Sequence, residues 1–132
     1  MTPTMKRTAL LAGIALWLPL AAFAKLNVVA TLPDLGALAQ EIGGDKIQVT
    51  SLASGMEDPH FVDPKPSFVR VLNRADVLIE GGAELELGWL PPLVNNARNP
   101  RILGNAPGHI LAAQSARMIQ LPVSAVDRSQ GD

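Results

Sequence analysis

The chain has 132 residues, of which 48% are hydrophobic and 17% are charged, with 11 basic and 12 acidic side chains and no cysteine. This length accommodates one compact domain, and the near-neutral charge leaves no basic excess to neutralise nucleic-acid phosphates. The lack of cysteine excludes a disulfide scaffold, an iron–sulfur centre, a thiolate zinc finger and a cysteine nucleophile. The apolar composition is typical of a folded chain rather than a disordered one.

The first 24 residues have the pattern of a cleavable signal peptide. A basic pair at residues 6–7 precedes an apolar run over residues 9–20, and residues 22–24 form the small-x-small motif of a cleavage site. Pro19 interrupts the run, which is short for a membrane span, so the pattern favours export over anchoring. No cysteine follows the cleavage point to carry a lipid. We therefore predict a signal peptide over 1–24 and an exported, periplasmic chain over 25–132.

The first half of this mature chain alternates strand and helix. Residues Leu26–Ala30 form a short strand-like run with β-branched Val28 and Val29 at its centre, and Ile47–Ser51 has the same strand-like character. Between them, Pro33-Asp34 is typical of a helix start and residues 43–44, both glycine, of a helix end. The helix is expected to bury one apolar stripe, which consists of Leu35, Leu38, Ala39 and Ile42.

The second half continues the alternation. Ser67 is expected to cap a helix with a second apolar stripe, followed by a strand over 77–79, a helix over 91–97 and a strand over 101–103. This order predicts an α/β fold with a parallel β-sheet and helices on both faces. Ligands of such sheets bind beyond the carboxyl ends of the strands. The loops expected there cover residues 31–33, 52–66, 80–90 and 104–109.

One of these loops concentrates the residue types that bind metals. Glu57, Asp58, His60 and Asp63 lie close together in a segment stiffened by three prolines. Imidazole and carboxylate without sulfur suit zinc, manganese or iron(II). The alternative is structural: the two aspartates cap turns before prolines, and His60 bonds to the backbone. The loop contains no H-x-H or H-E-x-x-H spacing, so it cannot complete a metal site by itself.

Two motifs resemble a known family. The run from Glu57-Asp58-Pro59-His60 to Pro66-Ser67, followed by residues 82–86 (GAELE) and Trp89-Leu90, is similar to the zinc/manganese solute-binding proteins of ABC transporters. The resemblance implies a fold of two α/β lobes with one divalent ion between them. It also implies that His60 is the first metal ligand and that the protein delivers zinc, or manganese, to a membrane permease without acting as an enzyme. Asp58, which Pro59 fixes in a turn, is expected to orient the loop or support the ligand rather than bind the metal, and Glu57 and Asp63 are expected to shape the loop.

The resemblance also indicates how much of the two-lobe fold this chain contains. Members of the family are roughly twice this length or more, a two-lobe size, and their remaining ligands come from later segments. We therefore expect residues 25–132 to be a truncated N-terminal lobe that lacks its C-terminal lobe. The alternatives are a truncated gene product without transport activity and a small exported metallohydrolase using His60 with Asp58 or Glu57 as base. Glu84 and Glu86 are expected to pair structurally, Trp89 to pack between helix and sheet, and His109 to lie on the surface.

Overall fold

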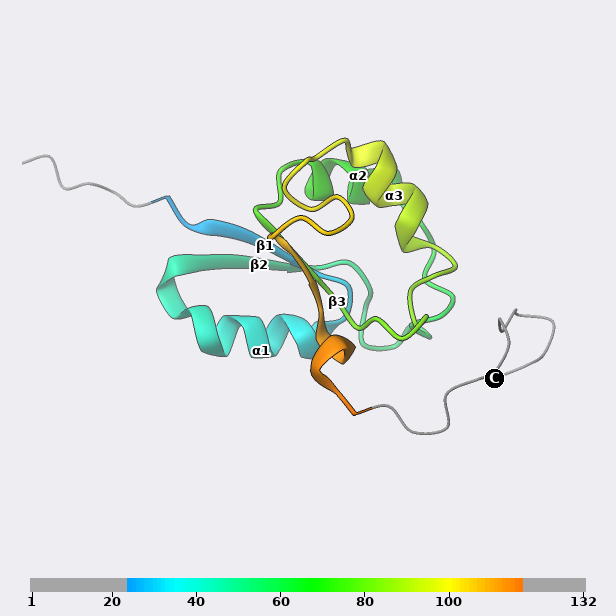
Figure 1. Cartoon of the computed structure of the whole chain (residues 1–132), viewed down its shortest axis with the longest axis horizontal. Helices are drawn as coiled ribbons and strands as arrows, with labels where there is room; N and C mark the ends of the chain where they lie inside the picture. Colours follow the sequence, from blue (N-terminus) through cyan, green and yellow to red (C-terminus); the bar gives the residue numbers. More distant parts are fainter. Residues whose placement is uncertain (1–23, 118–132) are drawn as a thin grey trace, which may run out of the picture.

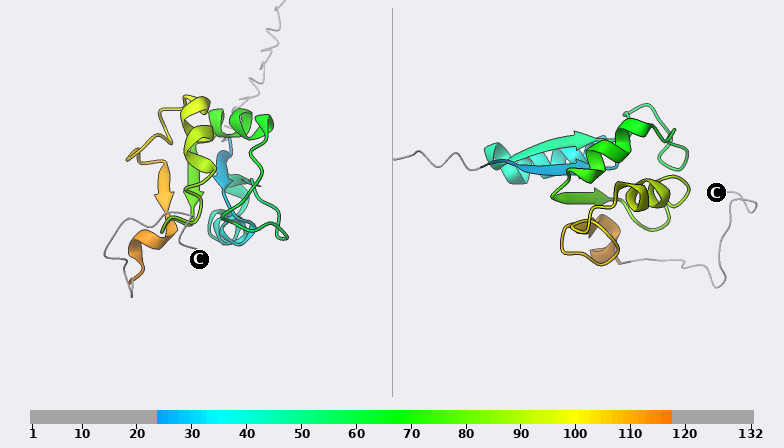
Figure 2. Two further views of the ribbon diagram at one scale, coloured as in Figure 1. Left: turned by 90° about the vertical axis from the view of Figure 1, so that its right-hand side faces the viewer. Right: turned by 90° about the horizontal axis from the view of Figure 1, so that it is seen from above.

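The strands form one parallel sheet in a computed structural model that describes residues 24–117. The sheet order is β2-β1-β3-β4, with β1 at Leu26–Ala30, β2 at Ile47–Ser51, β3 at Val77–Glu80 and β4 at His109–Leu111. All three pairings are parallel, and β4 lies at one edge of the sheet (Figure 2). The predicted fold class is therefore confirmed.

Helices cover both faces of the sheet. Helix α1 (Pro33–Gly43) lies on one face, and α2 (Pro66–Asn73) and α3 (Leu90–Ala97) lie together on the other (Figure 1). Two 3₁₀ helices, Gly44–Lys46 and Ala112–Ser115, follow α1 and β4. Each α-helix has a proline in its first two positions, where the missing N–H costs no hydrogen bond. No helix among the described residues is long and apolar enough to cross a membrane.

The expected apolar stripe of α1 is only partly buried. Ala39 is buried, but Leu38 is 61% and Ile42 88% exposed, so the prediction for these two residues is wrong. The reason is the close approach of the helix to the sheet: a Cβ placed on Gly36 would lie 2.5 Å from Ser51 Oγ and 3.6 Å from Ala30 Cβ. The helix therefore presents its small residues to the strands, which rotates the larger ones into solvent.

The main core lies between the sheet and the α2–α3 layer. Its fully buried side chains include Leu72, Leu78, Leu90 and Ile102. Helix α2 begins at Pro66 with Lys65 as its N-cap, so Ser67 lies inside the helix and the predicted cap is wrong. Pro66 starts the helix one residue before the serine, because its fixed φ already suits the first helical position.

A buried asparagine replaces the strand that was expected over 101–103. The Asn99 side-chain amide donates to the carbonyls of Leu72 (2.9 Å) and Ala75 (2.7 Å), and its Oδ1 accepts from Arg101 N (3.1 Å). The backbone then turns, with Ile102 N donating to Asn99 O at 3.2 Å. Ile102 is apolar because its side chain is buried in the main core, and it does not belong to a strand of the sheet.

Strand β4 therefore begins later than predicted, at His109. Gly108 precedes it, and a Cβ there would lie 2.5 Å from the carbonyl oxygens of both Arg101 and Asp76. The Gly108 carbonyl accepts from Leu78 N at 2.7 Å, which starts the β3–β4 pairing. As a result, residues 104–108 lie at the amino end of β4, and the prediction that this loop joins the ligand-binding edge is wrong.

Candidate functional site

The loop between β2 and α2 starts as a continuation of the sheet. Leu52 N donates to Ala30 O and Ala53 N to Thr31 O, both at 2.9 Å, so the loop leaves from the carboxyl edge of β1 and β2. It then turns at Ser54, whose N–H donates to Glu57 Oε2 at 2.6 Å. This hydrogen bond lowers the pKa of Glu57 from its ordinary value because it favours the charged carboxylate. Glu57 thus shapes the loop in the structure.

Asp58 orients His60. Its Oδ1 accepts the His60 backbone N–H at 2.9 Å and lies 3.0 Å from His60 Nδ1. The backbone hydrogen bond from His60, followed by that from its side chain, lowers the pKa of the Asp58 carboxyl from its ordinary value. A carboxylate can only accept, so this contact requires a proton on Nδ1 and assigns the neutral ring the tautomer with its lone pair on Nε2. Carboxylate-oriented imidazoles of this kind are typical of metal-ligating histidines.

Trp89 holds the same turn from the other side. The indole is 3% exposed, as expected for a tryptophan packed between helix and sheet, and its Nε1–H donates to Pro59 O at 2.8 Å. Trp89 is the residue before α3, so the candidate ligand loop is attached to the helix layer. The sequence indicated the packing of this side chain but gave no sign of its hydrogen bond.

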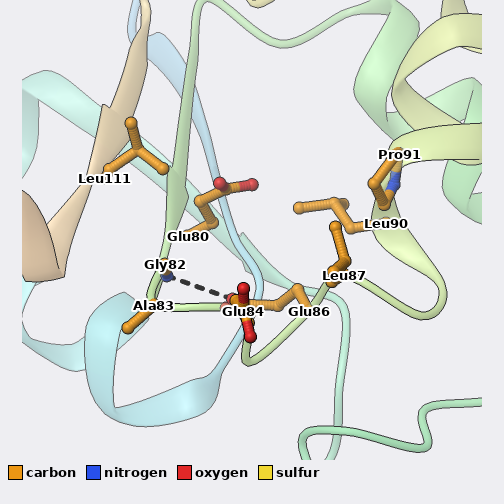
Figure 3. A pocket seen from close by; sticks show the side chains of 9 residues that line it. All are labelled: Glu80, Gly82, Ala83, Glu84, Glu86, Leu87, Leu90, Pro91 and Leu111. Atoms are coloured by element: carbon orange, nitrogen blue, oxygen red, sulfur yellow. Dashed lines mark hydrogen bonds between the residues drawn. The ribbon is translucent and has the colours of Figure 1, made fainter. Parts of the chain in front are cut away.

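A buried carboxylate joins the next loop to β1. Glu86 is 3% exposed, and its Oε1 accepts from Thr31 Oγ1 (2.6 Å) and Gly81 N (2.7 Å). Its Oε2 accepts from Gly82 N at 3.1 Å, the bond drawn in Figure 3. The expectation of structural pairing is confirmed for Glu86, whereas Glu84 is exposed and lines a pocket of about 200 Å³ beside it.

The loop around Glu86 has an unusual backbone. Gly82, Ala83 and Glu84 all have positive φ, at 74°, 53° and 70°. Two of the three carry a Cβ, which costs about 1–2 kcal/mol each in the left-handed region. The Glu86 carboxyl group accepts hydrogen bonds from Gly81 N and Gly82 N and so holds this backbone in place, which gives the buried side chain a structural role.

Asp63 and His109, the other residues considered in the sequence, make fewer contacts with the candidate ligand loop. Asp63 is exposed and makes no hydrogen bond or ion pair with another described residue. His109 is not the surface residue that was predicted: its side chain is only 13% exposed, because it begins β4 beneath the loop at residue 104. His109 Nδ1 lies 2.9 Å from Gly104 O, and its Nε2 lies 3.2 Å from Glu80 Oε2.

Over residues 24–117, no three histidine, aspartate or glutamate side chains are placed to hold one metal ion.

Comparison with protein families gives one clear match. The model described as "Zinc-uptake complex component A periplasmic", ZnuA, matches residues 28–118. Among curated proteins, the chain is 39% identical over 77 residues to the manganese ABC transporter substrate-binding lipoprotein ScaA of Streptococcus gordonii. That alignment covers 56% of this chain and 25% of the relative, so the chain spans about a quarter of the relative's length.

Solved structures agree on the fold. A crystal structure of ZnuA superimposes with a TM-score of 0.59 at 24% identity, covering 74% of this chain and 36% of that one. A zinc-bound ZnuA variant lacking residues 138–173 of its own sequence gives a TM-score of 0.54 at 29% identity, covering 58% and 29% of the two chains. The parallel sheet and its helices are thus the architecture found in part of these larger proteins.

Proposed function

This chain belongs to the ZnuA family of periplasmic zinc-uptake components, and on that basis we propose that it is the N-terminal, metal-capturing lobe of an ABC importer's substrate-binding protein. In this role it binds a divalent ion outside the inner membrane and passes it to a membrane permease. It acts as a receptor and not as an enzyme. Residues 1–24 serve as the cleavable signal peptide and residues 25–132 as the exported part.

One observation carries the proposal: Asp58 orients the His60 imidazole through Nδ1 at the carboxyl edge of the sheet. Metal-binding histidines need a fixed tautomer and a fixed ring, and a carboxylate on the other nitrogen supplies both. His60 is therefore proposed as the metal ligand, with Asp58 as its support. Glu57 and the exposed Asp63 shape the approach to it.

The cargo is zinc or manganese. Zinc is favoured because the matching family is named for zinc uptake, and manganese is kept because the curated relative is named for manganese. A nitrogen ligand among carboxylates accommodates either ion. The name of that relative also calls it a lipoprotein, whereas this chain has no cysteine on which a lipid anchor could be built.

The remaining ligands are proposed to come from a second, C-terminal lobe. The described residues bring no group of three ligands together, and one imidazole leaves most coordination positions to water. His60 therefore has to act with ligands from outside the described region to retain an ion tightly. This arrangement would place the ion between two lobes at the carboxyl edge of the sheet.

A zinc titration of this chain, followed through the histidine ring resonances, tests the proposal. We expect saturable binding that shifts His60, with a Kd weaker than about 1 µM because the ligand set is incomplete. His60→Ala should abolish this binding, whereas His109→Ala, which removes the other histidine of the chain, should not. Binding that survives His60→Ala would overturn the assignment, and submicromolar binding that depends on His60 would overturn the need for a second lobe.

A further inference from the structure

A single peptide unit next to the proposed ligand is held at both of its ends. The unit joins Pro59 to His60: its carbonyl oxygen accepts from Trp89 Nε1 at 2.8 Å, and its N–H donates to Asp58 Oδ1 at 2.9 Å. A peptide unit is planar and rigid, so two hydrogen bonds to its opposite edges fix the plane in space. The position of the His60 Cα, and hence the origin of its side chain, follows from that plane.

The two holding groups differ in how firmly they are anchored. Asp58 is exposed and belongs to the same short loop as His60, so by itself it orients the ring without locating the loop. Trp89 is buried in the main core, 30 residues along the chain from Pro59. The indole therefore supplies a hydrogen bond that ties the ligand turn to the rigid part of the fold, alongside Val62, which is buried in the same core.

The segment that carries Trp89 is itself fixed to the sheet. The Trp89 N–H donates to Glu86 O at 3.1 Å, and the Glu86 side chain is bound to Thr31 at the end of β1. A continuous set of contacts thus runs from the carboxyl end of β1 through Glu86 and Trp89 to Pro59. Each member is buried or half-buried, where a hydrogen bond restricts motion more than it does in water.

We propose that Trp89 is a positioning residue for the metal ligand His60: its indole N–H sets the place of the ligand turn through Pro59. The inference rests on the proposed function, because it assigns the held turn a purpose in metal binding. Loss of one neutral hydrogen bond of this kind corresponds to about a fivefold change in an equilibrium constant. Trp89→Phe should therefore weaken zinc binding about fivefold, since phenylalanine keeps an aromatic ring in the core and lacks the N–H donor.

Two measurements on Trp89→Phe test the proposal. The first is amide hydrogen exchange, in which the His60 N–H should exchange several times faster than in the unchanged chain. The amide of Leu78, which lies in β3 and donates to Gly108 O, serves as the internal reference and should change much less. The second is the zinc titration, in which the midpoint should rise about fivefold while the bound His60 resonances keep their positions.

Leu93→Ala is the matched control. Leu93 is 6% exposed on α3, so its truncation destabilises the same helix layer while leaving the indole in place. It should not raise exchange at His60 relative to Leu78, nor weaken zinc binding, at temperatures where the variant is folded. Equal effects of Leu93→Ala and Trp89→Phe would overturn the proposal, because they would show a general loss of stability.

The outcomes separate this inference from the function on which it rests. Unchanged exchange at His60 in Trp89→Phe would overturn the positioning role whether or not zinc binds. Faster exchange with unchanged zinc affinity would also overturn it, because the held turn would then not serve binding. If the unchanged chain binds no zinc at all, both the proposed function and the metal-positioning role fail, and faster exchange would show only that the indole holds the turn.

Discussion

Asn99→Ala should destabilise the fold far more than its single amide suggests. The side chain is 5% exposed and makes three hydrogen bonds, to Leu72 O, to Ala75 O and from Arg101 N. At about 1 kcal/mol for each, their loss corresponds to about 3 kcal/mol. A small domain is stable by about 5–15 kcal/mol, so the variant should lose a substantial part of its stability.

A second substitution at the same position separates hydrogen bonding from packing. Asn99→Asp preserves size and the acceptor for Arg101 N, but it turns a carboxylate oxygen toward the carbonyls of Leu72 and Ala75. Two acceptors then face a buried charge without a donor, which should make the aspartate variant less stable than the alanine variant. Packing alone would predict the opposite order, since aspartate fills the site and alanine does not.

Denaturant unfolding followed by circular dichroism measures both effects. Asn96→Ala is the control, because Asn96 is an exposed residue of the neighbouring helix and its loss should change the free energy of unfolding by less than about 0.5 kcal/mol. A loss below about 1 kcal/mol for Asn99→Ala would refute the reasoning from hydrogen bonds. An aspartate variant more stable than the alanine variant would refute it as well.

Three further predictions follow from the fold and the loop. Gly108→Ala should cost about 1–3 kcal/mol in urea unfolding because its Cβ meets two backbone oxygens, whereas Gly55→Ala, with nothing within 4 Å, should be near neutral; equal losses would contradict this. Ile42→Lys should leave the melting temperature unchanged because the side chain is 88% exposed, and a marked fall would show that α1 buries it. The hydrogen bonds from His60 should preserve the orienting Asp58 carboxylate in mild acid and release it only as the pH falls through its lowered pKa; a carboxyl ¹³C titration above the ordinary aspartate range would disagree.

The strands and helices of the first half were predictable because local signals coincide there. Strands β1 and β2 have the predicted bounds, and α1 ends as expected at the glycine pair, with Gly43 as its last residue and Gly44 as its C-cap. The face that α1 buries was not predictable, because periodicity ranks large apolar residues above glycine and alanine. Close packing reverses that ranking where a helix lies directly on a sheet.

The candidate site also has a part that the sequence predicts and a part that only the structure reveals. Residue types alone pointed to the loop that contains His60, because histidine, carboxylates and prolines are adjacent in the sequence. The contacts from Trp89 to Pro59 and from Glu86 to Thr31 join residues 30 and 55 positions apart, and no local pattern announces them. The fourth strand was predicted at 101–103 and lies at His109–Leu111 for the same reason, a contact between distant residues. Asn99 turns the chain by donating to the carbonyls of Leu72 and Ala75, more than 20 residues earlier.

These contacts join residues far apart in the sequence, and this separation affects the stage of folding at which the proposed metal site is formed. Parallel strands and contacts between distant residues form late in folding, because the loops that separate them must close first. We therefore expect the turn that contains His60 to reach its final place only after β1, β3 and the start of α3 have assembled around Glu86 and Trp89. If the proposed metal capture holds, we expect it to be a property of the completed fold, and a metal ion present during folding should speed the early steps little.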